Sequence, residues 1–282
     1  MSNTARDFIR QALAEDLGHG DVTTDSTVDE HAIGKAEIVA KQPLIVCGQE
    51  LAALVFNELA TQRGVLLEYD PVVPDGTAVT PKTVVARLQG PLRVILTGER
   101  TALNLLMKLS GIATNVRTFA DAAGPDGPRV VDTRKTTPLL RDFEKMAVRA
   151  GGGRNHRHAL YDGVLIKDNH VVAAGGVTNA ITRAKAKAHH LLRIECEVTT
   201  LAQLDEALDC GVDALLLDTR NDELLAAAVK QARARDPRVV LEASGNMTAE
   251  RIARIKHLGL DLVSAGGLIH QARWVDLSLE VL

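Results

Sequence analysis

Aromatic residues are scarce in this sequence. They make up 2% of the 282 residues, so a hydrophobic core has to be built mainly from Leu, Val, Ile and Ala. Branched aliphatic residues fill the strands of α/β proteins, whose sheets are covered on both faces. Proteins that bind single-stranded nucleic acid stack bases on aromatic side chains. The composition therefore favours an α/β fold and argues against single-strand nucleic-acid binding.

Cysteine, an excess of charge and long apolar runs are also lacking. The net charge is −3, so no overall basic field attracts nucleic acid or an anionic membrane. The three cysteines, Cys47, Cys196 and Cys210, show no metal-binding spacing and cannot all pair with one another. The N-terminal segment has no apolar signal core, and no stretch reaches transmembrane length. We expect a cytoplasmic protein without nucleic-acid or membrane partners.

The first part of the chain is patterned as a small α+β domain. Apolar residues at helical spacing predict an amphipathic helix over 4–17, and a polar loop is expected over 18–30. Short strand patterns then surround one helix, over 50–62, with the turn PDGT at 74–77. A long helix is predicted over 93–123, with a soft break at Ser110 and Gly111.

The rest of the chain alternates aliphatic runs with helical patterns. Strands are predicted at 129–133, 164–167, 192–198, 214–218, 238–244 and 262–266. Helices are predicted between them, at 138–150, 176–189, 201–209, 221–235 and 248–258. Buried strands that alternate with helices indicate a parallel sheet with right-handed crossovers. Because no dinucleotide-binding glycine fingerprint is present, the pattern favours an α/β barrel over an open sheet.

Charged or small residues follow the predicted barrel strands, where barrel enzymes place their active sites. The early strand ends carry the cations Arg134, Lys135 and Lys167, and the loop GGGRNHRH adds Arg154, His156 and Arg157. Middle strands carry the carboxylates Glu197 and Asp218, and the last two carry Ser244-Gly245 and Gly266-Gly267. The cations suit a carboxylate-bearing substrate, the glycines suit a phosphate, and the carboxylates suit Mg²⁺ or sugar hydroxyls.

Each of these features also has a purely structural interpretation. Arg134 and Lys135 fit a surface pair, and Lys167 fits a half-buried ion pair with Glu197 and Asp218. The glycines at 151–153 fit a helix cap, and the run SGNMTAE fits a helix start with Thr248 or Asn246 as its cap. The structural interpretations do not explain why all these residues fall at one rim of the barrel.

Several longer runs carry a family resemblance. The segments DTRKTTPLLRDFEKMAVRAGGGRNHRHALYDGVLIKDNH (132–170), ERTALNLLMKLSGIAT (99–114), LEASG (241–245) and AGGLIH (265–270) closely resemble the quinolinate phosphoribosyltransferase family, as does EDLGHGDVTTD (15–25). The resemblance implies an N-terminal α+β sandwich over 1–112, joined by 272–282. It also implies an incomplete α/β barrel over 113–271 and a homodimer whose barrels each face the partner's N-terminal domain.

The resemblance also implies roles for individual residues. Quinolinate is expected to be held by Arg134, Lys135, His156, Arg157 and Lys167, with Arg100 supplied by the partner subunit. Glu197 and Asp218 are expected at the ribose and Mg²⁺ of phosphoribosyl pyrophosphate, and Lys135, Lys167, Glu197 and Asp218 form the expected catalytic set. The phosphate is expected at Ser244, Gly245, Gly266, Gly267 and His270.

The expected reaction converts quinolinate and phosphoribosyl pyrophosphate to nicotinate mononucleotide, pyrophosphate and CO₂, with Mg²⁺ and no organic cofactor. Two other functions remain open at this point. A Schiff-base barrel enzyme would use Lys167 as its nucleophile, but it does not explain the additional cations. A silent binding protein would have no need of Glu197 and Asp218, and both are present.

Overall fold

The computed structural model describes residues 3–282, so Met1 and Ser2, the start of the predicted N-terminal domain, lie outside it. The chain divides into two compact units. The first unit comprises Met1–Asn115, Asp142–Gly152 and Ala272–Leu282, and the second comprises Val116–Arg141 and Gly153–Gln271.

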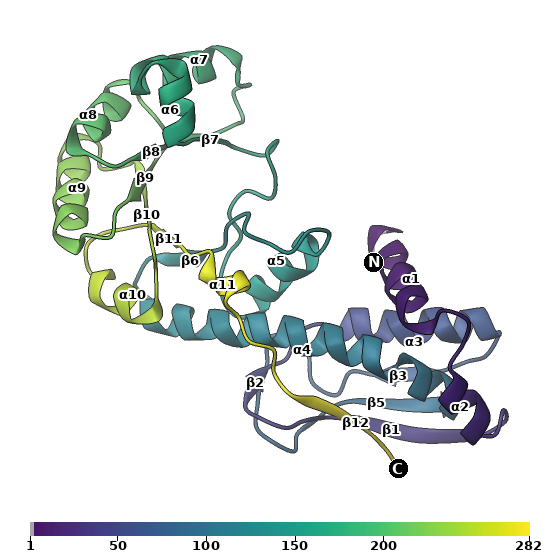
Figure 1. Cartoon of the computed structure of the whole chain (residues 1–282). Coiled ribbons are helices and arrows are strands. Elements are labelled where there is room, and N and C mark those ends of the chain that lie inside the picture. The colour runs from purple at the N-terminus through teal and green to yellow at the C-terminus, as the bar shows by residue number, and fades with distance from the viewer. Residues whose placement is uncertain (1–2) are drawn as a thin grey trace. The chain divides into compact units, whose positions relative to one another are not determined.

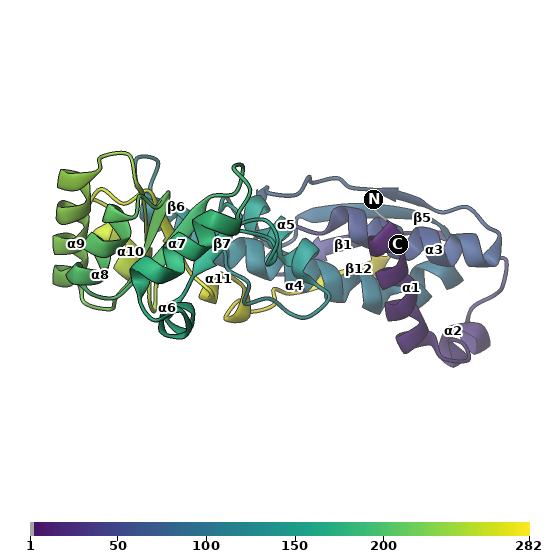
Figure 2. The same cartoon turned by 90° about the horizontal axis from the view of Figure 1, so that it is seen from above.

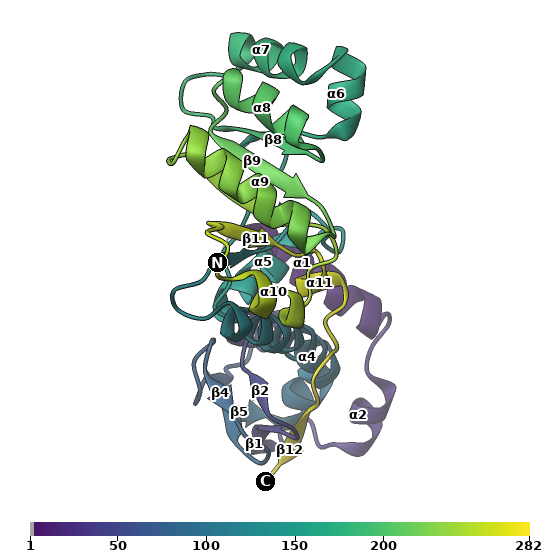
Figure 3. The ribbon, with the colours of Figure 1, turned by 90° about the vertical axis from the view of Figure 1, so that its left-hand side faces the viewer.

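The first unit packs helices against antiparallel strands. Its sheet has the order β12-β1-β5-β3, and β2 pairs with β4. These strands lie on one side of the long helix α4 (Figures 1 and 3). The elements are α1 (Asn3–Leu17), α2 (Val22–Thr27), β1 (Ile33–Ala40), β2 (Leu44–Ile45), α3 (Gln49–Arg63), β3 (Glu68–Asp70), β4 (Ala78–Val79), β5 (Val84–Pro91), α4 (Leu92–Ala123), α5 (Arg141–Ala150) and β12 (Leu277–Val281).

Helix α4 is unbroken, so the predicted break at Ser110 and Gly111 was wrong. The Ser110 hydroxyl is buried, accepts a hydrogen bond from the backbone N–H of Cys47 and donates one to its carbonyl oxygen. A Cβ at Gly111 would lie 2.2 Å from the carbonyl oxygen of Arg273. The two small residues therefore allow other segments to approach the helix closely, and they do not interrupt it.

The segment predicted as a polar loop over 18–30 contains the short helix α2. Its start is capped by Asp21, whose carboxylate accepts a hydrogen bond from the backbone N–H of Thr24 at 2.9 Å. A side-chain acceptor at this position satisfies an N–H that has no partner within the helix. The loop prediction overlooked Asp21 in the run GDVTTD, which is a residue type that commonly caps the start of a helix.

The second unit is built on six parallel strands in the order β6-β11-β10-β9-β8-β7. Helices α7, α8 and α9 lie outside the curved sheet (Figure 1). Among residues 3–282, no pairing joins β6 to β7, so the barrel is incomplete. The elements are β6 (Arg129–Val131), β7 (Val164–Ile166), α6 (Asp168–Ala174), α7 (Val177–Lys187), β8 (Ile194–Val198), α8 (Leu201–Asp209), β9 (Ala214–Asp218), α9 (Asp222–Arg235), β10 (Val240–Ser244), α10 (Ala249–Ile255), β11 (Leu262–Ser264) and α11 (Gly267–His270).

The predicted fold class is confirmed, including all six barrel strands. Two short helices, α6 and α11, follow strand ends where no helix was predicted, and α6 is separate from α7 (Figures 1 and 2). All three cysteines are free thiols. None of the helices that the structure describes combines the length and the apolar content needed to cross a bilayer.

Candidate functional site

Several polar side chains on the strands of the second unit lie on the same face of its sheet. Successive strand residues alternate between the faces, whereas partners in register share one. Glu197 and Glu242 are both in register with Leu216, and Asp218 is in register with Ser244. The carboxylates of three neighbouring strands are therefore directed to one side, where two cavities lie.

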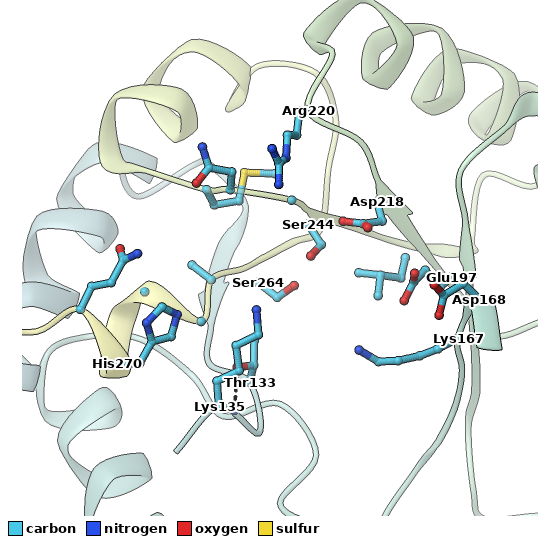
Figure 4. A pocket seen from close by; sticks show the side chains of 18 residues that line it. Thr133, Lys135, Lys167, Asp168, Glu197, Asp218, Arg220, Ser244, Ser264 and His270 are labelled. Carbon is cyan, nitrogen blue, oxygen red and sulfur yellow. Dashed lines mark hydrogen bonds between the residues drawn. The ribbon is translucent and has the colours of Figure 1, made fainter. Parts of the chain in front are cut away.

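The two cavities adjoin, because both are lined by Lys135 and Lys167. The larger cavity, of about 500 Å³, is lined by Lys135, Lys167, Glu197, Asp218, Ser244, Gly245, Gly266, Gly267 and His270 together with residues that were not predicted. The smaller cavity, of about 280 Å³, is lined by Arg134, Lys135, His156, Arg157, Lys167 and Glu242, among others. In Figure 4 the side chains of Lys135 and Lys167 enter the larger cavity from different elements.

The loop that carries His156 and Arg157 is held by a buried carboxylate at the end of β6. Asp132, which is fully buried, accepts a hydrogen bond from the backbone N–H of His156 at 2.9 Å. It also accepts one from the side-chain amide of Asn155 at 2.6 Å. At the other end of the loop, the carboxylate of Asp162 accepts hydrogen bonds from the backbone N–H groups of residues 158 and 159.

The ring of His156 uses both nitrogens within the protein. Nδ1 accepts a hydrogen bond of 2.7 Å from the backbone N–H of Arg157, and Nε2 lies 3.1 Å from the carboxylate of Glu195. A neutral imidazole carries one N–H, so an accepting Nδ1 places the proton on Nε2. The expected contact of this ring with a substrate would require one of the two bonds to break.

The smaller cavity concentrates positive charge. Burial, followed by repulsion from Arg134, lowers the pKa of Arg157, while Asp162 and Glu195 act in the opposite direction. Lys167 is exposed, contrary to the expectation that it is half-buried, because it follows β7 at the open end of the sheet. An exposed lysine lacks the desolvation that activates Schiff-base nucleophiles, which disfavours the aldolase-type alternative.

The carboxylates of Glu197 and Asp218 lie close together on one wall of the larger cavity (Figure 4). Burial raises the pKa of Glu197, Lys167 lowers it, and the negative charge of Asp218 raises it again. Carboxylate oxygens are the ligands that Mg²⁺ prefers, and this ion is commonly held by one or two carboxylates together with substrate phosphates. The pair fits such an ion.

Next to Asp218, the larger cavity exposes backbone. Gly245 has a φ of 95°, and a Cβ there would lie 3.1 Å from the carboxylate of Asp218 and 3.2 Å from the carbonyl oxygen of Thr219. The buried guanidinium of Arg251 donates hydrogen bonds to the carbonyl oxygens of Thr219 and Gly245 and to the carboxylate of Asp222. It thus ties the loops after β9 and β10 together. Thr248 caps α10, as one prediction had it.

With two exceptions, the structure brings every predicted site residue to the lining of these two cavities. The exceptions are Arg100, which lies exposed on α4, and Arg154, which lies exposed in the loop before His156; neither lines a cavity. Sequence reasoning gave no site role to Asp132, Glu195 or Glu242, although all three fall within the strands predicted at 129–133, 192–198 and 238–244. The strand periodicity was the available signal, because Glu195 lies two residues before Glu197 and Glu242 two before Ser244.

Comparisons with known proteins identify the family. Residues 21–110 match the N-terminal domain of quinolinate phosphoribosyl transferase, and residues 112–280 match its C-terminal domain. The chain is 39% identical over 280 residues to the nicotinate-nucleotide pyrophosphorylase (carboxylating) of Mycobacterium leprae, covering 99% of this chain and 98% of the relative. It is 41% identical over 274 residues to a probable enzyme of that name from Synechocystis, covering 97% and 91%.

Solved structures agree with the sequence matches. The nicotinate-nucleotide pyrophosphorylase from Francisella tularensis superposes with a TM-score of 0.92 at 35% identity, covering 99% of this chain and 96% of that one. The two domain matches together span most of the chain. The two relatives are 41% and 39% identical to it over 97% and 99% of its length. The chain therefore belongs to the quinolinate phosphoribosyltransferase family.

Proposed function

We propose that this protein is a nicotinate-nucleotide pyrophosphorylase (carboxylating) of NAD biosynthesis. It would join quinolinate to the ribose of phosphoribosyl pyrophosphate and release pyrophosphate and CO₂. The observation that carries the proposal is the pair of adjoining cavities in a chain of this family, one cationic and one lined by carboxylates and by the backbone of glycines. The cationic cavity suits a pyridine that carries two carboxylates, and the other cavity suits a sugar that carries phosphates.

The smaller cavity is the proposed quinolinate site. Its guanidinium and ammonium groups, those of Arg134, Arg157, Lys135 and Lys167, match two adjacent carboxylates on one small ring. Arginine suits this role because its planar fork binds a carboxylate through two parallel hydrogen bonds. We propose that His156 acts mainly by holding Arg157, because both ring nitrogens already have protein partners.

The larger cavity is the proposed site of phosphoribosyl pyrophosphate. Backbone at Gly245, Gly266 and Gly267, with the side chains of Ser244 and His270, would receive phosphate oxygens. The carboxylates of Glu197 and Asp218 would face the ribose. Mg²⁺, held there by these carboxylates and the substrate's own phosphates, would offset the charge of the departing pyrophosphate.

The proposed chemistry depends on positioning and charge. Departure of pyrophosphate leaves positive character on the anomeric carbon, which Glu197 and Asp218 favour electrostatically. Lys135 and Lys167, which line both cavities, would hold the two substrates against each other so that the ring nitrogen faces that carbon. The positive charge of the resulting pyridinium nitrogen stabilises the electron pair that stays on the neighbouring ring carbon when its carboxylate leaves as CO₂.

We propose a homodimer with shared sites, in which Arg100 reaches the partner subunit's quinolinate site. Support comes from its exposure on α4 and its absence from both cavity linings. Arg100→Ala and Arg134→Ala variants should each lose nearly all activity. An equal mixture of the two, after subunit exchange, contains hybrid dimers with one intact site each, and it should recover roughly a quarter of the wild-type activity. No recovery after verified subunit exchange would exclude a contribution in trans. The cytoplasmic location stays a prediction.

The function is tested by incubating the purified protein with quinolinate, phosphoribosyl pyrophosphate and Mg²⁺. Nicotinate mononucleotide and CO₂ should form in equal amounts. Chelation should abolish turnover without lowering the unfolding temperature, and Mg²⁺ should restore it, because the carboxylates are needed only at the substrate. A borohydride-trapped adduct at Lys167, without any need for phosphoribosyl pyrophosphate, would instead support the aldolase-type alternative.

A further inference from the structure

Two carboxyl groups that have no role in the proposed function lie beside the cationic cavity. Glu242 is 1% exposed and Glu195 is 9% exposed, and their nearest oxygens lie 3.6 Å and 3.1 Å from Nε2 of His156. Within residues 3–282, Glu242 Oε2 and Glu195 Oε1 are buried without a hydrogen-bond partner. Glu242 lines the smaller cavity with Arg134 and Arg157, whereas Glu195 does not.

A divalent cation is one candidate occupant of this cluster. One nitrogen of His156 and one oxygen of each carboxylate lie within 4.8 Å of one another. The hydrogen bonds of the imidazole argue against a metal, however. Because Nδ1 accepts the N–H of Arg157, Nε2 carries the proton and has no lone pair to offer an ion. The cluster is therefore better suited to hold a proton.

The surroundings of Glu242 favour its protonated form. Burial raises its pKa to about 7, and the negative charge of Glu195 contributes to the rise. His156, the hydroxyl of Ser264 and Lys167 act in the opposite direction. The other cations that line the same cavity are Arg134, Lys135 and Arg157. A bound dicarboxylate adds two negative charges to that cavity, which favours the neutral acid further.

We propose that Glu242 is the general acid that protonates the pyridine ring after CO₂ leaves. The inference rests on the proposed function, because it assigns a residue to the last step of that reaction. When the bond from the ring to the carboxylate breaks, its electron pair stays on the ring carbon. The O–H bond of Glu242 then breaks, and its proton forms the new C–H bond. The carboxylate of Glu242 recovers a proton from solvent before the next turnover.

The other polar groups of the smaller cavity are less suited to this step. Arginine does not release a proton in proteins, and the Nε2–H of His156 is directed to Glu195. Lys135 and Lys167 would lose the charge that holds the substrates if they gave up a proton. A carboxylic acid that titrates near neutrality is also a stronger acid than an ammonium group.

The test compares Glu242→Gln with Glu195→Gln in the full-length protein, by single-turnover formation of nicotinate mononucleotide and by steady-state kinetics. Gln has the shape of Glu but no transferable proton. Glu242→Gln should lower the single-turnover rate by on the order of 10²-fold or more, the usual contribution of a general acid, while the KM for quinolinate changes by only a few-fold. Glu195→Gln should retain most of the rate at acidic pH.

The pH profile separates a catalytic role from a structural one. The wild-type rate should fall as pH rises through the pKa of Glu242, because the acid must be protonated. Burial raises this pKa most, and Glu195→Gln removes the negative charge that adds to the rise. The rate of Glu195→Gln should therefore fall at lower pH than that of the wild type, and the rate of Glu242→Gln should show no such fall. The inference is overturned if Glu242→Gln turns over within a few-fold of wild type, keeps the same fall, or loses quinolinate binding together with turnover.

Failure of this inference is distinguishable from failure of the function. A wild-type protein that releases no CO₂ from quinolinate would refute the proposed reaction itself. A wild-type protein that does so beside an equally active Glu242→Gln variant would refute only the role of Glu242. If Glu242→Gln does not fold, the Glu195→Gln profile decides: an unshifted fall contradicts the proposal, and a shift to lower pH supports it.

Discussion

The backbone N–H of Arg157 donates a hydrogen bond of 2.7 Å to Nδ1 of His156. This bond places the ring's proton on Nε2, next to Glu195, and so joins an arginine at the cavity surface to a buried carboxylate. The same loop is held by the buried carboxylate of Asp132, which accepts a hydrogen bond from the backbone N–H of His156. The position of the cationic loop thus depends on Asp132, which lines neither cavity.

The Asp132 anchor leads to the first prediction. Asp132→Asn should lower kcat/KM for quinolinate by at least about tenfold, because a buried bond to a charged acceptor contributes about 1.5–3 kcal/mol. Asp162→Asn is the matched control, since Asp162 accepts backbone N–H groups at the exposed end of the same loop. Steady-state kinetics with circular dichroism check the pair, and equal effects of the two variants would contradict the anchoring role.

Activity should depend on the shape of the side chain at position 134 as well as on its charge. Arg134→Ala should cost about 2–5 kcal/mol of transition-state binding, which is the usual cost of removing one partner of a desolvated charge pair. Arg134→Lys should recover only part of this, because an ammonium group cannot bind a carboxylate through two parallel bonds. Arg154→Ala, an exposed arginine outside both cavities, serves as the control. Nearly intact kcat/KM in Arg134→Ala would exclude this placement of quinolinate.

Arg251 and Arg254 allow a test of stability, since both contact Asp222 from the same helix. The Arg251 side chain is 7% exposed and that of Arg254 is 62% exposed. Arg251→Met should lower the free energy of unfolding by about 3–5 kcal/mol, because it leaves buried acceptors unpaired. Arg254→Met should cost about 0–1 kcal/mol, as exposed ion pairs do. Urea unfolding measures both, and similar losses would show that burial does not set the difference.

The phosphate end is tested at Gly245. Gly245→Ala adds a methyl group 3.1 Å from Asp218, at a φ of 95°, and should raise the KM for phosphoribosyl pyrophosphate more than that for quinolinate. Gly64→Ala separates backbone strain from the site, because Gly64 has a φ of 65° and open space around it. That control should lose some stability, about 1 kcal/mol, and keep its kinetics.

Strand patterns in the second unit were predictable because they depend on local periodicity. Short aliphatic runs between helices located all six parallel strands, and the residues after them marked the rim. Element boundaries were less certain: α2 was missed within the segment 18–30, and a break was expected where α4 continues. A hydrogen bond to the capping residue Asp21 starts α2. In α4, the small residues Ser110 and Gly111 allow Cys47 and Arg273 to approach the helix closely without interrupting it. The proposed domain limits, 1–112 with 272–282 and 113–271, stay predictions.

The sequence by itself determined the fold class, the family and the set of charged residues at the strand ends. These follow from composition, from periods of 2 and 3.6, and from long runs of family-specific residues. Tertiary structure alone decided that Lys135 and Lys167 line both cavities, and that Glu195 and Glu242 are buried within 3.1 Å and 3.6 Å of Nε2 of His156. The reason is physical: burial and the direction of a hydrogen bond depend on strands far apart in the chain, and they set which charge a carboxyl group carries.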